Sequence, residues 1–471
     1  MGGLFGIVSK KDCVKDLFYG TDYHSHLGTM RGGLAVRNSD GIVRFIHDIT
    51  NAQFRSKFED DIQKMHGNKG IGVISDYEDQ PLIIGSHLGV YSIVTVGKIA
   101  NLEELAKKAF KKRKIHFAEM SGGEINPTEL VATLINEQAN FEDGIQYSQE
   151  AIEGSCSLIL LTEKGIYVAR DKLGRTPIII GKKQGAYAAT LETCAFPNLG
   201  FETGKYLGPG EIVLITEEGV EQKKKPRDKM QICSFLWVYY GYPASGYEGI
   251  NVEATRYRCG AALARNDNIP IDIVAGIPDS GIAHGLGYAN EKKIPFERPF
   301  VKYTPTWPRS FMPQNQEKRN EVAKMKLIPI RELIHGKGLL FCEDSIVRST
   351  QLQDTIDRLI KAGVKEVHMR PSCPPLVYGC EYLNFSRSRS VMDLAARKAI
   401  KKLERREDLA REELEAYSNP DSEKFKVMID KIRETLGLTS LKYQKLSDLV
   451  AAIGLPKEKL CTHCWDGSSY S

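Results

Sequence analysis

Short apolar runs that alternate with glycine-bearing turns dominate the first half of the chain. The runs GIGVIS (70–75), YSIVTVG (91–97), CSLILLT (156–162) and EIVLIT (211–216) have the length of strands, and a few helical stretches lie between them. Up to about residue 225 this pattern predicts a β-rich α+β domain. The basic, proline-bearing stretch QKKKPRDKM (222–230) marks its expected end.

Beyond that stretch, strand-like and helix-like segments alternate. The runs IDIVAG (271–276), GLLFCE (338–343) and VKEVHMRP (364–371) fit the strands of a parallel sheet. Ligands of such sheets bind at the carboxyl ends of the strands. The charged segment 397–417 could form a coiled coil, but its apolar heptads are not sustained, so we expect a single amphipathic helix covering the sheet. The predicted domains are 1–228, 229–390 and 391–471.

The composition narrows the class of protein. With 471 residues, 42% hydrophobic and 27% charged, the chain is long enough for two or three folded domains and is not a disordered one. No apolar run is long enough to cross a bilayer, and a net charge of +5 is weak, so we expect neither a membrane nor a nucleic acid as partner. The N-terminus lacks a secretory signal, which predicts a cytoplasmic protein. Ten cysteines are then no disulfide framework.

The stretch LLFCEDSIVRSTQL (339–352) indicates a strand, a loop and the start of a helix. A loop at a helix N-terminus offers unpaired N–H groups to a phosphate, and hydroxyl side chains add hydrogen bonds. The acidic residues Glu343 and Asp344 suit sugar hydroxyls. Because the chain has no Walker sequence, these features favour a sugar phosphate over a nucleotide held by its triphosphate.

Two further segments carry related chemistry. GIPDSGIAHGLGYA (276–289) is another strand-end loop, with Asp279 and with glycines that permit close backbone approach. KYTPTWPRSFMPQ (302–314) is rich in proline and carries Lys302 and Arg309. Cationic side chains near two acid-bearing turns are what a magnesium diphosphate leaving group requires.

These motifs resemble those of the glutamine phosphoribosylpyrophosphate amidotransferase family. CEDSIVRST (342–350) is similar to its phosphoribosylpyrophosphate signature, IPDSGIAHGLGYA to its diphosphate loop and PRSFMPQ (308–314) to its flexible catalytic loop. In the first half, GGLFGIVSK, MRGG, RDKLGRTPIIIG and LGPGEIVLITEEG resemble its glutaminase domain. The resemblance covers almost the whole chain. It implies an αββα domain of the N-terminal-nucleophile-hydrolase type, then an α/β type I phosphoribosyltransferase domain with a helical C-terminal segment.

The resemblance also implies a reaction: ammonia displaces diphosphate from phosphoribosylpyrophosphate to give phosphoribosylamine, the first step of purine biosynthesis. Asp344 and Glu343 would hold the ribose hydroxyls. The 5-phosphate would bind the loop of Ser345, Ile346, Val347, Arg348, Ser349 and Thr350. The magnesium diphosphate would bind Arg309, Lys326, Lys302, Asp279 and Ser280. The signature departs from the family at Glu343, which replaces Asp, and at Ser349 and Gln351, which replace Gly and Thr.

The glutaminase-like half departs from the family at each position that carries its chemistry. Gly2 stands at the nucleophilic cysteine, Ser75 at the arginine that holds the substrate carboxylate, and Pro127 at the aspartate that binds the amine. Val96 replaces the oxyanion asparagine, and only Gly97 of that segment is kept. Loss of one oxyanion donor alone costs about 10²–10³-fold in rate. We therefore expect no glutamine hydrolysis, with ammonia or a partner glutaminase as the nitrogen source.

The terminal CTHC (461–464) is ambiguous by itself, because it could be half of a zinc site, a redox pair or two incidental thiols. In the cluster-bearing branch of the family, four ligand cysteines match Cys233, Cys380, Cys461 and Cys464 of this chain. The resemblance thus implies a structural 4Fe-4S cluster at the domain junction, with zinc as the alternative. Packing roles are expected for the remaining thiols, Cys13, Cys156, Cys194, Cys259, Cys342 and Cys373.

Three functions remain open at this point. The first is an amidophosphoribosyltransferase supplied with ammonia. The second is a phosphoribosyltransferase for another amine or base, in which the glutaminase-like half serves as a scaffold. The third is a non-catalytic regulatory protein that binds phosphoribosylpyrophosphate. The resemblance further implies a homo-oligomer.

Overall fold

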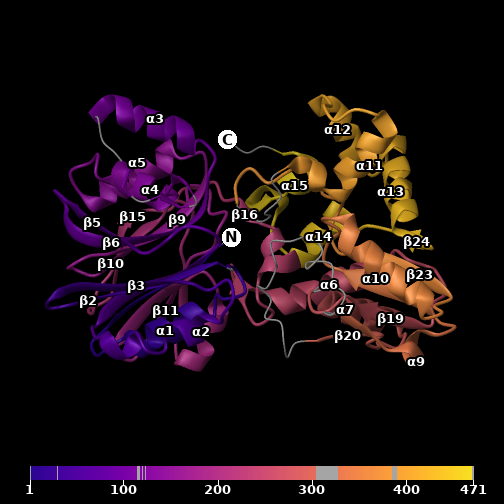
Figure 1. The fold of residues 1–471 in the computed structure, drawn as a ribbon, viewed down its shortest axis with the longest axis horizontal. Coiled ribbons are helices and arrows are strands. Elements are labelled where there is room, and N and C mark those ends of the chain that lie inside the picture. The colour runs from indigo at the N-terminus through magenta and orange to yellow at the C-terminus, as the bar shows by residue number, and fades with distance from the viewer. Residues whose placement is uncertain are drawn as a thin grey trace.

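The chain folds into two bodies that lie side by side, a β-rich one from the N-terminal half and one with a parallel sheet from the C-terminal half (Figure 1). The structure is a computed structural model that describes residues 2–28, 30–113, 117–118, 120–121, 123–303, 327–383 and 390–468. None of the described helices combines the length and the apolar character that a membrane span requires.

Two stacked antiparallel sheets form the centre of the first body. The first sheet has, in spatial order, β13 (Glu202–Tyr206), β11 (Ile179–Lys183), β12 (Ala186–Thr190), β1 (Gly3–Ser9), β4 (Lys69–Ser75), β2 (Arg31–Asn38) and β3 (Gly41–Asp48). The second has β15 (Val220–Lys224), β14 (Ile212–Ile215), β10 (Ile166–Ala169), β9 (Gly154–Leu161), β6 (Gly89–Ile99) and β5 (Leu82–Ser86).

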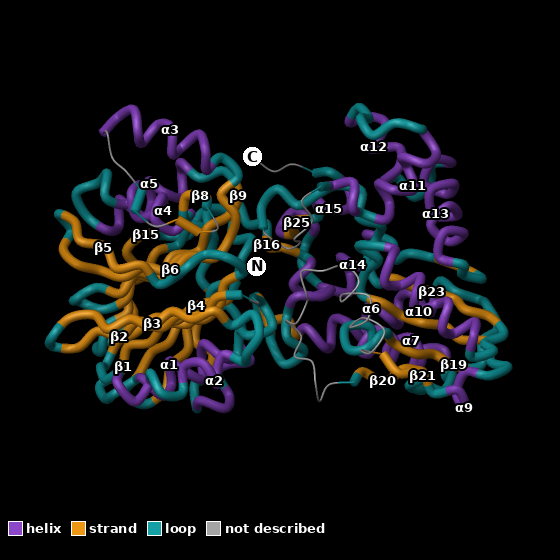
Figure 2. Tube along the Cα trace, viewed as in Figure 1, coloured by secondary structure: helices purple, strands orange, loops and turns teal. Residues whose placement is uncertain are grey.

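Helices cover the outer face of each sheet, which makes an αββα arrangement (Figure 2). They are α1 (Val14–Asp22) and α2 (Phe54–Phe58) on the first sheet, and α3 (Leu102–Arg113), α4 (Pro127–Ile135) and α5 (Phe141–Ala151) on the second. Alternation along β1 shows why: Leu4 and Val8 pack between the sheets, whereas Phe5 and Ile7 pack against α1. This is the fold class that the sequence predicted for this half.

A parallel sheet of four strands forms the core of the second body. Its spatial order is β19 (Ile273–Gly276), β22 (Gly338–Glu343), β23 (Glu366–Pro371) and β24 (Ser440–Leu441). The helices around it are α6 (Val252–Arg265), α7 (Ile282–Lys292), α9 (Arg331–Ile334), α10 (Ser349–Lys361), α11 (Ala395–Glu404), α12 (Arg411–Ser418), α13 (Glu423–Leu436), α14 (Leu446–Ile453) and α15 (His463–Asp466).

Both faces of this sheet are buried, in agreement with the predicted α/β class. Along β22, Leu339 and Phe341 face the core shared with α10, α11 and α13. Leu340 and Cys342 face α6 and α7 instead. The sequence of a parallel strand that is covered on both faces is a continuous apolar run, and β22 has this pattern.

The expectation of one amphipathic helix over residues 397–417 is wrong. The segment forms two helices, because α11 ends at Glu404 and α12 begins at Arg411. Arg405 takes the left-handed conformation that ends α11, and its amide donates a hydrogen bond to the Lys401 carbonyl at 2.9 Å. Both helices pack against α13, so two short helices cover more of it than one straight helix could.

Short strands complete the structure. They are β7 (Met120–Ser121), β8 (Glu124–Ile125), β16 (Ile232–Cys233), β17 (Gly246–Tyr247), β18 (Ile250–Asn251), β20 (Phe300–Lys302), β21 (Leu327–Pro329) and β25 (Leu460–Cys461). Parallel pairing of β16 with β25 joins the segment between the two bodies to the C-terminal segment, near the middle of the view in Figure 2.

Candidate functional site

The carboxyl ends of two neighbouring parallel strands form the edge of the candidate active site. β19 ends at Gly276, β22 ends at Glu343, and Gly276 pairs with Cys342. The Ile277 amide donates a hydrogen bond to the Cys342 carbonyl at 3.0 Å, so the loops that follow the two strands start side by side. This edge of a parallel sheet is where α/β proteins bind their ligands.

The loop after β19 turns tightly against β22 because two glycines allow close backbone contact. A Cβ atom at Gly281 would lie 2.3 Å from the Cys342 carbonyl oxygen, and one at Gly276 would lie 2.4 Å from the Gly281 carbonyl oxygen. No side chain fits at such distances. The turn brings Ser280 to the acidic pair, where its hydroxyl donates a hydrogen bond to Glu343 Oε1 at 3.4 Å.

The two acidic residues at the end of β22 are buried and in contact. Glu343 is 9% exposed and Asp344 is 5% exposed. The Asp344 amide donates to Glu343 Oε1 at 3.1 Å, and the Ser345 hydroxyl donates to Asp344 Oδ1 at 2.6 Å. Burial and the neighbouring Asp344 carboxylate raise the pKa of Glu343 well above its usual range. Glu343 therefore favours its neutral form, which can donate as well as accept a hydrogen bond.

A lysine of β20 also contacts the loop that follows β19. Lys302 on β20 forms an ion pair with Asp279, with 2.6 Å between Nζ and Oδ2. The structure thus brings together two of the residues that the sequence assigned to the diphosphate. The other two cations of that assignment, Arg309 and Lys326, lie outside the described residues.

The loop between β22 and α10 is anchored by one buried side chain and one backbone hydrogen bond. Ile346 is buried in the core beneath the sheet, and the Val347 carbonyl accepts a hydrogen bond from the Ala395 amide at 2.9 Å. Arg348 is exposed and directly precedes α10. The helix then begins, as the sequence predicted, although the side chains of residues 349–351 lie outside what the structure describes.

A buried cation near the acidic pair was not found from the sequence. Arg256 of α6 donates from Nε to the Trp237 carbonyl at 3.0 Å and from Nη2 to the Tyr239 and Gly241 carbonyls at 2.9 Å. Burial lowers the pKa of Arg256, and the negative charge of Asp344 opposes that shift. No local pattern distinguishes this arginine from others on amphipathic helices, so the sequence offered no signal for it.

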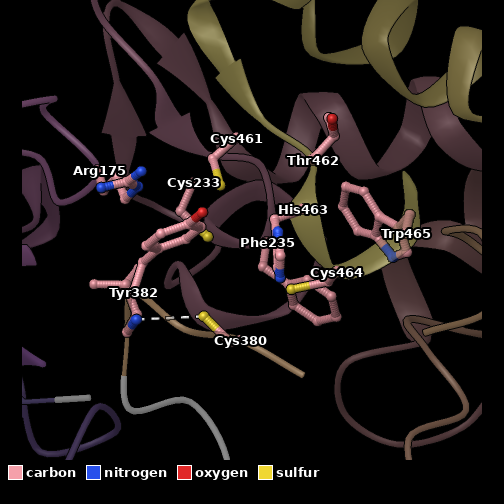
Figure 3. A pocket seen from close by; sticks show the side chains of 11 residues that line it. Arg175, Cys233, Phe235, Cys380, Tyr382, Cys461, Thr462, His463, Cys464 and Trp465 are labelled. Atoms are coloured by element: carbon pink, nitrogen blue, oxygen red, sulfur yellow. Dashed lines mark hydrogen bonds between the residues drawn. The ribbon is translucent and has the colours of Figure 1, made fainter. Parts of the chain in front are cut away.

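Four cysteines from three separate segments of the chain line one small cavity at the domain junction. Figure 3 shows the sulfur atoms of Cys233, Cys380, Cys461 and Cys464 around this space. Cys233 and Cys461 are paired residues of β16 and β25. A hydrogen bond from the Cys464 thiol lowers the pKa of Cys380 to about 6, whereas burial raises the pKa of Cys233 and that of Cys461.

Both bodies contribute to the surroundings of these cysteines. The Cys380 carbonyl accepts a hydrogen bond from Lys98 of the first body at 3.2 Å, and Arg175 lies 3.6 Å from the centre of the Tyr382 ring. The Cys464 carbonyl accepts from two backbone amides, those of residues 377 and 378, at 3.2 Å. The four thiols therefore converge where the two bodies meet, although no three His, Cys, Asp or Glu side chains of the described residues lie close enough to hold a single metal ion.

The position of the expected nucleophile in the first body is packed against backbone. A Cβ atom at Gly2 would lie 2.4 Å from the Ile74 carbonyl oxygen and 3.4 Å from Val96 Cγ2. Val96 itself belongs to the core between the sheets. The Ser75 hydroxyl donates to the Glu78 carbonyl at 2.6 Å, so it stabilises the turn after β4.

Gly97 and Pro127 have structural roles in addition to lining an open cavity of the first body. Gly97 has a φ of +148°, and a Cβ atom there would lie 1.9 Å from the Ser155 carbonyl oxygen. Pro127 is the first residue of α4, a position that needs no amide hydrogen. The preceding Asn126 caps the helix by accepting from the Thr128 amide at 2.9 Å.

Similar proteins agree with this division of the chain. A family model described as a glutamine amidotransferase domain matches residues 69–196, which belong to the first body. A solved structure titled glutamine phosphoribosylpyrophosphate amidotransferase from B. subtilis, complexed with ADP and GMP, matches 99% of this chain and 96% of its own, with a TM-score of 0.84 and 25% identity. The fold thus defines the class: a glutamine amidotransferase-type domain joined to a phosphoribosyltransferase domain.

The curated relatives that match the chain share one enzyme name. The amidophosphoribosyltransferase of Bacillus subtilis (strain 168) is 29% identical over 392 residues, or 81% of this chain and 80% of the relative. That of Methanothermobacter thermautotrophicus is 28% identical over 482 residues, or 99% of this chain and 93% of the relative. The chain is thus similar to amidophosphoribosyltransferases over nearly its full length.

Proposed function

We propose that the protein converts phosphoribosylpyrophosphate and ammonia into phosphoribosylamine and diphosphate, the reaction that opens purine biosynthesis. The similarity of the chain to amidophosphoribosyltransferases supports the reaction. The observation that carries the proposal is the buried pair of Glu343 and Asp344, which lies at the carboxyl end of β22 beside the loop of Asp279 and Ser280.

The proposed roles follow from the chemistry of each group. Asp344 and Glu343 bind the two ribose hydroxyls, with Glu343 able to donate a hydrogen bond because burial keeps it neutral. The loop of residues 345–350 binds the 5-phosphate through amides at the start of α10, where the helix dipole favours an anion. Asp279, together with Ser280 and Lys302, takes the diphosphate with its magnesium ion, as do Arg309 and Lys326.

The reaction needs a neutralised leaving group and a stabilised positive charge on the sugar. The nitrogen lone pair of ammonia forms a bond to the anomeric carbon while the bond from that carbon to the diphosphate oxygen breaks. The extra proton on nitrogen passes to solvent. Positive charge develops on the ribose as the diphosphate departs, and the Asp344 carboxylate stabilises it from a position that is already fixed by its hydrogen bond from Ser345.

Free ammonia, or ammonia from a partner glutaminase, is the proposed nitrogen source. A side chain at position 2 would meet the Ile74 carbonyl oxygen, and the Ser75 hydroxyl is engaged by the turn after β4. The first body therefore has neither a nucleophile nor a carboxylate clamp at the expected positions. The variant Gly2→Cys should not release glutamate from glutamine, because the new side chain has no room and no oxyanion donor.

The test measures diphosphate release from phosphoribosylpyrophosphate with ammonium chloride, with glutamine and with neither. We expect release with ammonium chloride only. Release with glutamine, together with glutamate formation above a contaminant control, would refute the loss of glutaminase activity. Binding of phosphoribosylpyrophosphate without release by any nitrogen donor would instead identify a regulatory protein.

The four junction cysteines are proposed to hold a 4Fe-4S cluster, with zinc as the alternative. Their convergence on one cavity supports a metal site made of cysteines. Four thiolates that each bind a different iron lie further apart than thiolates around one zinc ion, where each metal–sulfur distance is about 2.3 Å. Among the described residues, no three His, Cys, Asp or Glu side chains are close enough to hold a single metal ion, and metal analysis distinguishes the cluster from zinc. Its proposed role is to hold the C-terminal segment against both bodies.

A further inference from the structure

The glutaminase-like body keeps a large open cavity, although its expected catalytic positions are filled or replaced. The cavity measures about 680 Å³ and lies between the start of α3, the start of α4 and the neighbouring strands β6 and β9. A volume of this size suits a small organic molecule. Gly97 and Pro127 line it, as do Tyr77, Glu78, Thr95 and Ser155.

A buried hydroxyl of the cavity wall has no partner. Ser155 is 2% exposed, and its Oγ forms no hydrogen bond with any described residue. The nearby hydroxyl of Thr95 differs, because it is paired with the Thr128 hydroxyl at 2.7 Å. Buried hydroxyls in folded proteins are almost always hydrogen-bonded. A ligand in the cavity could supply the hydrogen bond that the Ser155 hydroxyl lacks.

The charged residues that line the cavity indicate whether a ligand of Ser155 carries positive or negative charge. Carboxylates outnumber ammonium groups among the described lining residues, which are Glu78, Glu103, Glu104, Glu124 and Glu153 against Lys98 and Lys107. Both lysines are engaged, since Lys107 pairs with Glu103 at 3.6 Å and Lys98 donates to the Cys380 carbonyl.

Glu78 is the most enclosed of these carboxylates. Burial raises the pKa of this half-buried carboxyl group to about 7, although a hydrogen bond from Tyr77 and the charge of the N-terminal ammonium group act in the opposite direction. The described residues include no lysine or arginine that forms an ion pair with it. A carboxylate in this state gains from a cationic ligand, because the pair offsets the cost of desolvation.

We propose that this cavity binds a small organic amine, with its ammonium head paired to Glu78 and hydrogen-bonded to the Ser155 hydroxyl. An aliphatic diamine fits best, because a second ammonium group can pair with Glu124 or Glu153 at the rim. The same charges disfavour amino acids as ligands, because the carboxylate of an amino acid would face Glu78. The chain also has Ser75 at the position where the family has the arginine that binds such a carboxylate. The site is independent of the phosphoribosyl site and of its reaction.

Calorimetry of the full-length protein with putrescine tests the site, in the absence of phosphoribosylpyrophosphate. Wild type and the exposed control Glu163→Gln should bind one putrescine per chain. Glu78→Gln should weaken binding by about tenfold or more, because it removes the charge partner and keeps the side-chain shape. Ser155→Ala should weaken it by about threefold to tenfold while leaving Glu78 in place.

Two results would overturn the proposal. One is the absence of saturable putrescine binding to wild type at concentrations up to the millimolar range. The other is equal binding by wild type and a folded Glu78→Gln or Ser155→Ala, as judged by circular dichroism. Glutamine and glutamate serve as comparison ligands, and tighter binding of either than of putrescine would also contradict the assigned charge.

Discussion

Glu343 ends a buried strand, and burial and the neighbouring Asp344 carboxylate oppose the ionisation of its carboxyl group. In the folded protein its pKa is raised, whereas in the unfolded chain it is about 4.3. As pH rises above that value, the unfolded state releases this proton more readily, so the stability contribution of Glu343 falls until pH passes the folded pKa. Glu343→Gln cannot ionise, so it should raise Tm on the order of 2 °C at about pH 8 and change it less at about pH 5.

Thermal unfolding at the two pH values, followed by circular dichroism, measures this difference. The exposed Glu163→Gln is the matched control and should leave Tm unchanged at both. An equal or lower Tm for Glu343→Gln at the higher pH would show that Glu343 is ionised in the folded protein.

Asp344 tests the catalytic assignment, because its neighbour Ser345 holds it in one orientation. Asp344→Asn keeps the shape of the side chain but removes its charge. If that charge stabilises the transition state, kcat should fall about 10²-fold, while the Kd for phosphoribosylpyrophosphate changes by about threefold or less. Asp354→Asn, on an exposed face of α10, is the control for the same chemical change. A loss confined to Kd would assign Asp344 to binding alone.

At the scale of elements, β6 depends on a glycine for its approach to β9. Gly97→Ala would place a Cβ atom 1.9 Å from the Ser155 carbonyl oxygen at a φ of +148°, so strand and partner must separate locally. We expect a loss of about 2 kcal/mol or more in the free energy of unfolding, measured as a lower urea midpoint. Gly85→Ala on the adjacent β5 meets no atom within 4 Å and should change the midpoint little. Equal midpoints for the two variants would mean that this part of β6 is more pliable than its contacts indicate.

The helical region after residue 390 shows where a periodic pattern misleads. The charged and apolar positions of residues 397–417 repeat as in one helix. The helix nevertheless ends before Arg405, which takes the left-handed backbone conformation. Packing on α13 decides this break, because each short helix can place its apolar face on that partner separately. Propensity along the segment contains no information about α13, so the break could not be predicted from it.

For the whole molecule, the cysteine cavity connects both bodies and the C-terminal segment. If it holds a 4Fe-4S cluster, protein purified without oxygen should be brown and contain about four irons per chain. Each of the variants Cys233→Ser, Cys380→Ser, Cys461→Ser and Cys464→Ser should lose the iron, because one missing thiolate leaves one iron unligated. Metal analysis and visible absorption measure the loss.

The control for this series is Cys13→Ser, a buried cysteine in the core beside α1 that lies outside the cavity. It should keep its iron. Zinc in place of iron in the wild type would replace the cluster assignment with the four-cysteine zinc site, and retention of metal by all four variants would refute the ligand set.

Much of the fold can be predicted from local patterns, because many strands of the first body are short apolar runs and β22 is one continuous apolar run. The acidic pair could likewise be placed at the end of β22 and before α10, since a strand, a loop and a helix each have a signature within about ten residues. Recognition of the family motifs then supplied the proposed roles. The contacts of Arg309 and Lys326 remain predictions, because the structure does not describe those residues.

The sequence by itself determined the two fold classes and the place of the acidic pair and of the loop between β22 and α10, because each depends on residue types at neighbouring positions. Only the tertiary structure decided which distant groups meet: Ser280 with Glu343, Cys233 with Cys461, and Ser155 with the cavity that Glu78 lines. These contacts join segments that are separated by many residues, and their stability comes from packing and burial in the folded chain. No local pattern encodes such a meeting, so it appears only when the sheets and helices are assembled.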